Sequence, residues 1–265
     1  MIGTNHVQRY CTAILDEFGA SVLFLKELTL TAIYRPCENR YVFEQVWKVT
    51  IQSLSTVAMA GFFVGAILVV QFTVQITEFG ALGYLGGLTT SATIREVGPL
   101  LIAFMLAGKI GAFTAAELGT MRVTEQIDAI RCLGADPMQE IILPRFVGIV
   151  ISSFFLLAVG LAMSLSGGIV LGYVFSGISP EEYVRHIPTF FTIPSVLGGL
   201  YKCLIFAITL ATVCTYKGYN ASGGARGVGR AVVSTAIVTM IGIVTTDWFT
   251  SLTIETVLGL FGGNS

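Results

Sequence analysis

The strongest constraint on the fold of this chain is a pair of long stretches without any acidic or basic side chain. One lies between Lys48 and Glu78, and the other lies between Arg145 and Glu181. Each exceeds the roughly 20 apolar residues that an α-helix needs to cross a bilayer. Apolar residues make up 54% of the chain and charged residues only 12%, and the mean hydropathy is +0.81. Too little charge is available to cover a soluble surface, so we predict an integral membrane protein.

The apolar stretches predict an all-α membrane domain with five spans. A turn at residues 80–87 separates the first two spans, and the polar loop 217–230 separates the last two. Ser179 followed by Pro180 has the pattern of a helix N-terminus, so we expect a short helix outside the membrane after the third span. The predicted spans cover residues 48–77, 88–108, 141–175, 193–216 and 231–260.

The N-terminal segment, residues 5–35, predicts a helix of a different kind. Its apolar residues recur at helical spacing, but charged residues such as Lys26 and Glu27 interrupt them too often for a span. A helix with one apolar stripe and one charged face lies in the membrane surface, and we expect it to end before Pro36. The alternative is a soluble helix packed on the cytoplasmic face of the domain.

Basic residues indicate the orientation of the spans. They gather in the N-terminal segment, in the connector between the second and third spans and in the last loop, whereas the opposite side carries only Arg185. Lysine and arginine are enriched in cytoplasmic loops. The N-terminus, the connector and the last loop are therefore predicted to be cytoplasmic, and the C-terminus to lie outside.

Four ionisable residues fall inside predicted spans: Arg95, Glu96, Lys202 and Asp247. A charge in hydrocarbon costs about 2.5–3.5 kcal/mol on insertion scales, so such residues usually face a polar cavity or a partner. Arg95 and Glu96 either line a cavity that accepts a charged head group or lock the bundle through ion pairs. Lys202 is a second cationic contact or a residue that extends to the interface, and Asp247 is a candidate counter-charge.

The connector between the second and third spans is the most distinctive polar segment. Residues 125–130 predict a short helix with Ile127 and Ile130 on an apolar side and with Glu125 and Asp128 exposed. Gly and Pro then break the helix at 133–137. A helix of this kind is either a capped loop or an element that docks into a groove of a partner protein.

Gly61 and Gly65, four residues apart in the first span, have the spacing that lets two helix backbones approach closely. We assign them to helix packing within the chain or to a dimer contact.

Motifs for catalysis and metal binding are missing from the sequence. It contains no GxxxxGK[ST], no HExxH and no GxSxG, and its five cysteines show no CxxC spacing. We therefore predict that the chain is not an enzyme and holds no metal, and that any energy for transport comes from another chain.

Two segments carry a resemblance to a known family. REVGPLLIAFMLAGKIGAFTAAELGTMRVTEQIDAI followed by LGADPMQEIILPRF, and KCLIFAIT with KGYNASGGARGVGRA, resemble the MlaE (YrbE) permease family, the membrane subunits of MCE-type ABC lipid transporters. The likeness is close over residues 94–146 and looser over 201–247. Residues 1–50 and 177–196 agree in residue type only.

The resemblance implies a single permease domain over residues 1–265, forming a homodimer in the bacterial inner membrane. The family moves phospholipids between that membrane and a periplasmic conduit and maintains outer-membrane lipid asymmetry. The implied partners are a P-loop ATPase (MlaF-like) that holds ATP and Mg, an MCE-domain protein (MlaD-like) and a small STAS-type subunit (MlaB-like). No cofactor is expected in this chain, and no nucleic acid is expected as a partner.

The resemblance also implies roles for individual residues. Arg95 and Glu96 match the family's lipid cavity, and Lys202 matches its fourth-span lysine. The coupling region spans residues 117–135. Its residues expected to transmit motion from the ATPase are Glu117, Glu125, Gln126, Ile127, Asp128 and Ile130.

Two other classes of function remain as alternatives. An ion-coupled secondary transporter or channel would use the intramembrane charges as a relay, although five spans without internal repeats disfavour it. A membrane scaffold without transport would tolerate neutralisation of Arg95 and Lys202.

Overall fold

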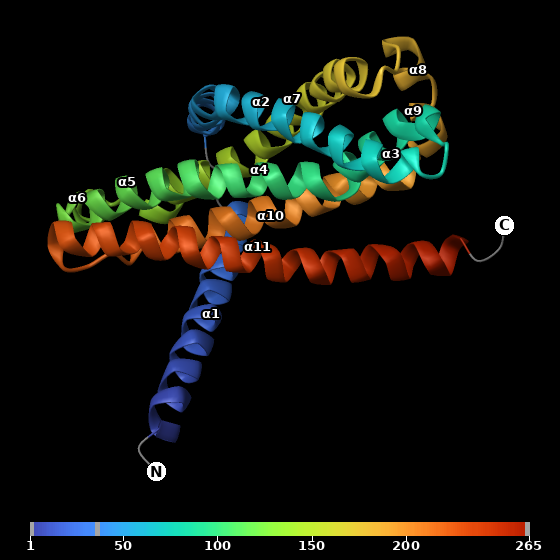
Figure 1. Cartoon of the computed structure of the whole chain (residues 1–265). Coiled ribbons are helices and arrows are strands. Elements are labelled where there is room, and N and C mark those ends of the chain that lie inside the picture. Colours follow the sequence, from blue (N-terminus) through green and yellow to red (C-terminus); the bar gives the residue numbers. More distant parts are fainter. Residues whose placement is uncertain (1–2, 35–37, 263–265) are drawn as a thin grey trace.

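The computed structural model describes residues 3–34 and 38–262, and in this part of the chain the regular elements are helices, with no strand. Five helices are long and apolar enough to cross a membrane, and they run side by side (Figure 1). The prediction of an all-α membrane protein with five spans is confirmed. The five are Asn39–Thr77, Leu82–Val123, Met138–Ser176, Ile193–Tyr219 and Gly224–Thr256.

The second and third spans are built from several helical segments, whereas the others are single helices. The first span is α2 (Asn39–Thr77), the fourth is α10 (Ile193–Tyr219) and the fifth is α11 (Gly224–Gly262). The second consists of η1 (Leu82–Tyr84), α3 (Leu85–Ala92), η2 (Thr93–Val97), α4 (Gly98–Leu106), η3 (Ala107–Gly111) and α5 (Ala112–Val123). The third consists of η4 (Met138–Ile142) and α7 (Leu143–Ser176).

Shorter helices cover the two ends of the bundle. The helix α6 (Gln126–Cys132) lies at one end, near the turn that joins α10 to α11 (Figure 1). The helices α8 (Pro180–Arg185) and α9 (Ile187–Phe190) lie at the opposite end. The α8 helix begins as the sequence predicts, because Pro180 is its first residue and the Ser179 hydroxyl accepts a hydrogen bond from the Glu182 N–H at 3.2 Å.

The closest packing in the bundle is between α2 and α7. A Cβ atom added at Gly65 would lie 1.9 Å from the carbonyl oxygen of Ser164, and one added at Gly61 would lie 2.5 Å from that of Gly160. The two backbones therefore touch where the glycines stand, as small residues allow in membrane helices. The structure uses this glycine spacing inside the chain.

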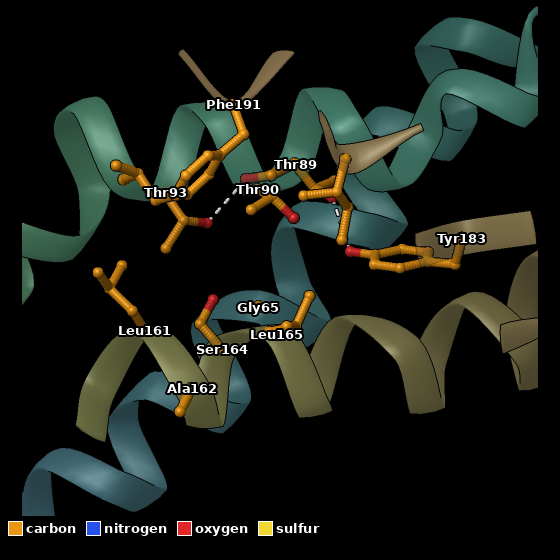
Figure 2. A pocket seen from close by; sticks show the side chains of 12 residues that line it. Gly65, Thr89, Thr90, Thr93, Leu161, Ala162, Ser164, Leu165, Tyr183 and Phe191 are labelled. Atoms are coloured by element: carbon orange, nitrogen blue, oxygen red, sulfur yellow. Dashed lines mark hydrogen bonds between the residues drawn. The ribbon is translucent and has the colours of Figure 1, made fainter. Parts of the chain in front are cut away.

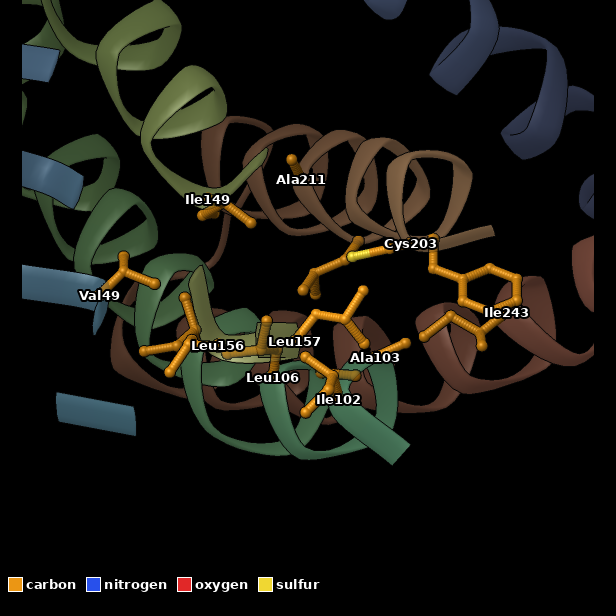
Figure 3. Close-up of a cluster of buried hydrophobic side chains, with 14 of the residues drawn as sticks. Val49, Ile102, Ala103, Leu106, Ile149, Leu156, Leu157, Cys203, Ala211 and Ile243 are labelled. Carbon is orange, nitrogen blue, oxygen red and sulfur yellow. The ribbon is translucent and has the colours of Figure 1, made fainter. Parts of the chain in front are cut away.

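The main core lies among α2, α4, α7 and α10, with one contribution from α11. Val49, Ile102, Leu156 and Ile243 are among its buried side chains (Figure 3). Apolar side chains interdigitate here and hold the spans in a fixed arrangement, which positions the polar residues at the edges of the core.

Two turns of π-helix precede prolines in the spans. In η2 the N–H of Gly98 donates to the carbonyl of Thr93, just before Pro99. A proline ring clashes with the carbonyl four residues earlier in an α-helix, and a wider turn relieves the clash. Because η2 contains Arg95 and Glu96, this turn sets the directions of both side chains.

The N-terminal helix α1 (Gly3–Tyr34) projects away from the bundle at a steep angle (Figure 1) and is not among the five candidate spans. Phe24 and Leu28 anchor it to the bundle, and the ring of Phe24 lies 5.6 Å from that of Tyr216. Its position in the membrane surface stays a prediction, and Pro36, where we expected it to end, lies outside the described residues.

Candidate functional site

The most unusual polar feature of the bundle is a lysine buried inside it. Lys202 of α10 is 1% exposed, and its ammonium donates to Glu96 of η2, to Asp247 at 3.2 Å and to the Ser251 hydroxyl at 2.7 Å, the last two on α11. An ammonium has three donors, and all three are used. The cluster therefore satisfies the buried charge and joins the second, fourth and fifth spans.

In the sequence Lys202 is the one charged residue of its predicted span, and Asp247 is a candidate counter-charge. The structure brings them together and adds Ser251, which we did not single out. On an α-helix Ser251 is four residues after Asp247 and therefore lies on the same face. That spacing, opposite a buried lysine, is the signal in the sequence that could have identified Ser251.

Arg95 differs from its neighbour Glu96 in having no ion-pair partner among the residues that the structure describes. Its side chain is exposed, and it lines a small cavity of about 20 Å³ together with Glu96 and Lys202. Ser195 of α10 and Glu255 of α11 line the same cavity. The Lys202 ammonium is already paired with two carboxylates, so the Arg95 guanidinium beside it is the planar group whose donors are available for an anion.

The cavity is too small to hold an anionic head group in this arrangement. A volume of about 20 Å³ accommodates a single water molecule, which needs roughly 10–15 Å³. A larger ligand at Arg95 requires the neighbouring helices to move apart or requires the guanidinium to reach outside the chain.

The coupling region lies at the opposite end of the second span from α8 and α9. Sequence reasoning placed Glu125 inside a helix, but α6 begins at Gln126 and Glu125 adopts a left-handed conformation with φ 60°. The reason is that the second span continues through α5 to Val123, so the chain must reverse within two residues before α6. Glu125 and Gln126 are both exposed.

The apolar side of α6 packs on the bundle. Ile127 is fully buried and Ile130 packs against a cluster that includes Leu118 of α5. Both residues therefore attach α6 to the second span, so that movement of α6 would be passed to α5.

Asp128 is half-exposed and is held by arginines of the chain itself. The guanidinium of Arg122 donates to both of its carboxylate oxygens, at 2.8 and 2.9 Å, and that of Arg131 lies 3.7 Å away. Leu133 at the end of α6 is 86% exposed and was missed by sequence reasoning. In the sequence this residue could have been identified as a single leucine in a polar loop, directly before a glycine.

Glu117 lies in α5 and faces other spans of the chain. Its carboxylate is 3.1 Å from the ammonium of Lys48 in α2 and 3.4 Å from the guanidinium of Arg145 in α7. It therefore joins three spans at the end of the bundle that carries α6.

Comparison with known proteins decides the class of the chain. The model of the family described as Permease MlaE matches residues 42–253, which include the Lys202 cluster and the coupling region. The chain belongs to the MlaE permease family. It is a multi-pass membrane protein and an ABC-transporter permease, a class that works with an ATPase partner.

Relatives of this MlaE-family permease occur in distant organisms. A probable ABC transporter permease protein of Rickettsia conorii is 31% identical over 88% of this chain and 90% of its own length. The intermembrane phospholipid transport system permease protein MlaE of Haemophilus influenzae is 28% identical over 73% of this chain and 75% of its own. The chloroplastic protein TRIGALACTOSYLDIACYLGLYCEROL 1 of Arabidopsis thaliana is 28% identical over 80% of this chain and 61% of its own.

Proposed function

We propose that this permease is the membrane subunit of an ATP-driven transporter that moves phospholipid between the bacterial inner membrane and a periplasmic conduit of MCE-domain protein. Its role is to maintain the lipid asymmetry of the outer membrane. The single observation that carries the proposal is the exposed Arg95 guanidinium, which has no ion-pair partner among the described residues and lies beside the Lys202–Glu96–Asp247 cluster. The printed name of the Haemophilus relative, an intermembrane phospholipid transport permease, supports the choice of substrate.

Arg95 is the proposed contact for the lipid phosphate. A guanidinium binds a phosphate through two parallel hydrogen bonds, and in apolar surroundings such bonds are stronger than in water. Glu96 and Lys202 act together in this proposal, because the Lys202 ammonium donates its hydrogen bonds to Glu96 and to the α11 residues Asp247 and Ser251. An incoming phosphate competes with Glu96 for the lysine.

The proposed assembly is a homodimer bound to P-loop ATPase subunits on one side and to an MCE-domain protein on the other, with a small STAS-type subunit as a further candidate. The exposed apolar face of α11 supports the dimer, since Val233, Ile237, Val244 and Trp248 are exposed on this helix. A second copy at α11 would enlarge the cavity at Arg95, which is too small within one chain.

Coupling to ATP is proposed to run through α6. Glu125 and Gln126 are exposed for contact with the ATPase, while Ile127 and Ile130 attach α6 to α5. ATP and Mg would be held by the partner, and movement of α6 would shift the second span, which carries Arg95 at its other end. Coupling through α6 requires α6 to be cytoplasmic, and the distribution of basic residues supports a cytoplasmic location for α6 and for the N-terminus.

Purification of the permease from its native membrane with its bound neighbours tests the proposal. Mass spectrometry is expected to identify a P-loop ATPase, an MCE-domain protein and co-purifying phospholipid. Purification of the intact complex without any nucleotide-hydrolysing subunit would contradict it.

The contact of Lys202 with two carboxylates supports one alternative, an ion-coupled transporter that uses Glu96, Lys202 and Asp247 as a relay. Transport that persists without ATP and collapses with the proton gradient would favour that alternative.

A further inference from the structure

A second cavity, of about 240 Å³, lies between α2, the second span, α7 and the α8–α9 segment (Figure 2). The η2 turn separates it from the Lys202 cluster. Thr93 and Ile94 line this cavity, whereas Arg95 and Glu96, the next residues of the same turn, line the small cavity beside Lys202.

The walls of this cavity are apolar and carry no charge. Leu161, Leu165, Ile187 and Phe191 line it, and no acidic or basic side chain does. Its volume exceeds that of a cavity of about 150 Å³ lined by Leu, Ile and Phe that stays dry and binds benzene. A hydrocarbon ligand therefore fits these walls better than water or a charged group.

A small set of hydroxyls gives the cavity one polar side. The Thr89 hydroxyl and the Tyr183 hydroxyl form a hydrogen bond of 2.7 Å, and the Thr93 hydroxyl donates to the Thr89 carbonyl at 2.8 Å. Burial raises the pKa of Tyr183 above its ordinary value, which keeps the phenol neutral. These groups are satisfied by the protein.

Ser164 of α7 is different. It is 5% exposed, its Oγ has no hydrogen-bond partner among the described residues, and Figure 2 shows that oxygen directed into the cavity toward Thr90 and Thr93. This hydroxyl is open to a cavity whose walls are mainly apolar, so an acceptor on a ligand would give it a hydrogen bond that the protein does not supply.

The cavity opens toward the outer surface of the bundle. Ala162 and Phe191, which belong to its lining, are both exposed. Ala162 belongs to α7 in the third candidate span, and the medium around an exposed residue of a span is lipid, so acyl chains are the hydrocarbon available there.

We propose that this cavity binds one acyl chain of a membrane lipid, with the ester carbonyl accepting a hydrogen bond from Ser164 and with the head group outside. No charged side chain lines the cavity, so the head group makes no specific contact there. The site is distinct from the proposed transport site at Arg95, and it would exist whether or not the bound lipid is cargo.

Photolabelling of the whole complex in nanodiscs of phosphatidylethanolamine tests this site. One arm contains a trace of phosphatidylethanolamine with a diazirine on its acyl chain, and a second arm contains diazirine-labelled palmitic acid. Mass spectrometry is expected to find the phospholipid label on the peptides that contain residues 89–94 and 161–165. Labelling of these residues by the fatty acid alone, or by neither probe, would overturn the proposal.

Variants separate occupancy of the cavity from general contact with lipid. Thr90→Phe fills the space and is expected to reduce labelling at least tenfold, whereas Thr77→Phe, at an exposed position of α2, is not.

Ser164→Ala removes one hydrogen bond and is expected to reduce labelling about fivefold. Ser166→Ala is its control, because that hydroxyl donates to the Met163 carbonyl of its own helix. Equal labelling in all four variants would refute the site, and because the readout is binding, a failure of the transport proposal would not affect it.

Discussion

The ammonium of Lys202 in α10 lies 3.2 Å from a carboxylate oxygen of Asp247 in α11, so an ion pair joins the fourth and fifth spans inside an apolar bundle. Glu96 extends the pair to the second span. Removing one member of a buried pair leaves the other charge without compensation, which costs more than the pair contributes. The cluster is therefore expected to determine both the stability of the folded bundle and the size of the cavity beside Arg95.

Lys202→Met tests the structural role of the cluster. It leaves Glu96 and Asp247 facing each other without a cation, and we expect the free energy of unfolding to fall by about 3 kcal/mol. Tryptophan fluorescence during thermal unfolding in detergent measures the change.

The neutral triple variant, Lys202→Met with Glu96→Gln and Asp247→Asn, is the matched control. Most of the lost stability should return, because no uncompensated charge remains. A single variant as stable as the parent protein would show that the ion pairs do not hold the spans.

Gly65→Ala tests the close contact of α2 and α7. The new Cβ would lie 1.9 Å from the Ser164 carbonyl, so the two helices must separate, and we expect a strong loss of folded protein. Gly108→Ala is the control, since nothing lies within 4 Å of a Cβ there. Size-exclusion profiles of the two variants measure the difference, and similar yields would be inconsistent with this packing.

Glu117→Gln distinguishes two roles for a residue that the family resemblance assigns to coupling. In the structure it pairs with Lys48 and with Arg145, whose side chain is only 12% exposed. We expect the free energy of unfolding to fall by about 1.5 kcal/mol, the low end for hydrogen bonds to charged groups because Glu117 is 31% exposed, with binding of the ATPase unchanged. Loss of ATPase co-purification at unchanged thermal stability would instead indicate a direct contact.

Glu125→Lys with Gln126→Lys tests coupling through α6. Both side chains are exposed, so the permease should remain folded while ATP-dependent transport falls at least tenfold. Asp128→Lys is less informative, because Asp128 also holds Arg122. Glu181→Lys, an exposed position on α8 at the other end of the bundle, should leave transport intact. Full transport by the Glu125→Lys/Gln126→Lys variant would exclude this contact.

Local sequence patterns predicted the spans and the start of α8. A long apolar stretch without charge crosses lipid as a helix, because a helix satisfies its own backbone hydrogen bonds. Ser179-Pro180 has the residue pattern of a helix N-terminus. These features depend on residues that are neighbours in the sequence, so the sequence alone was enough to predict them.

Partners across the bundle could not be predicted in the same way. Glu96 and Lys202 are far apart in the sequence, and the directions of Arg95 and Glu96 depend on the π-helical turn before Pro99. A proline inside a span signals a distortion but not the direction in which it turns the neighbouring side chains. The same holds for Glu125, whose left-handed conformation follows from the unexpected length of α5.

Transport by the reconstituted complex measures whether the Arg95 guanidinium and ATP are both needed to move phospholipid. The permease with its ATPase and MCE-domain partners is placed in proteoliposomes, and transfer of fluorescent phospholipid to acceptor protein is measured with and without ATP for the parent protein, Arg95→Gln and Arg185→Gln. We expect ATP-dependent transfer that falls about 10- to 100-fold in Arg95→Gln, because a charged hydrogen bond to phosphate is lost, and that is unchanged in Arg185→Gln. Equal transfer by Arg95→Gln and the parent protein, or transfer that does not need ATP, would contradict it.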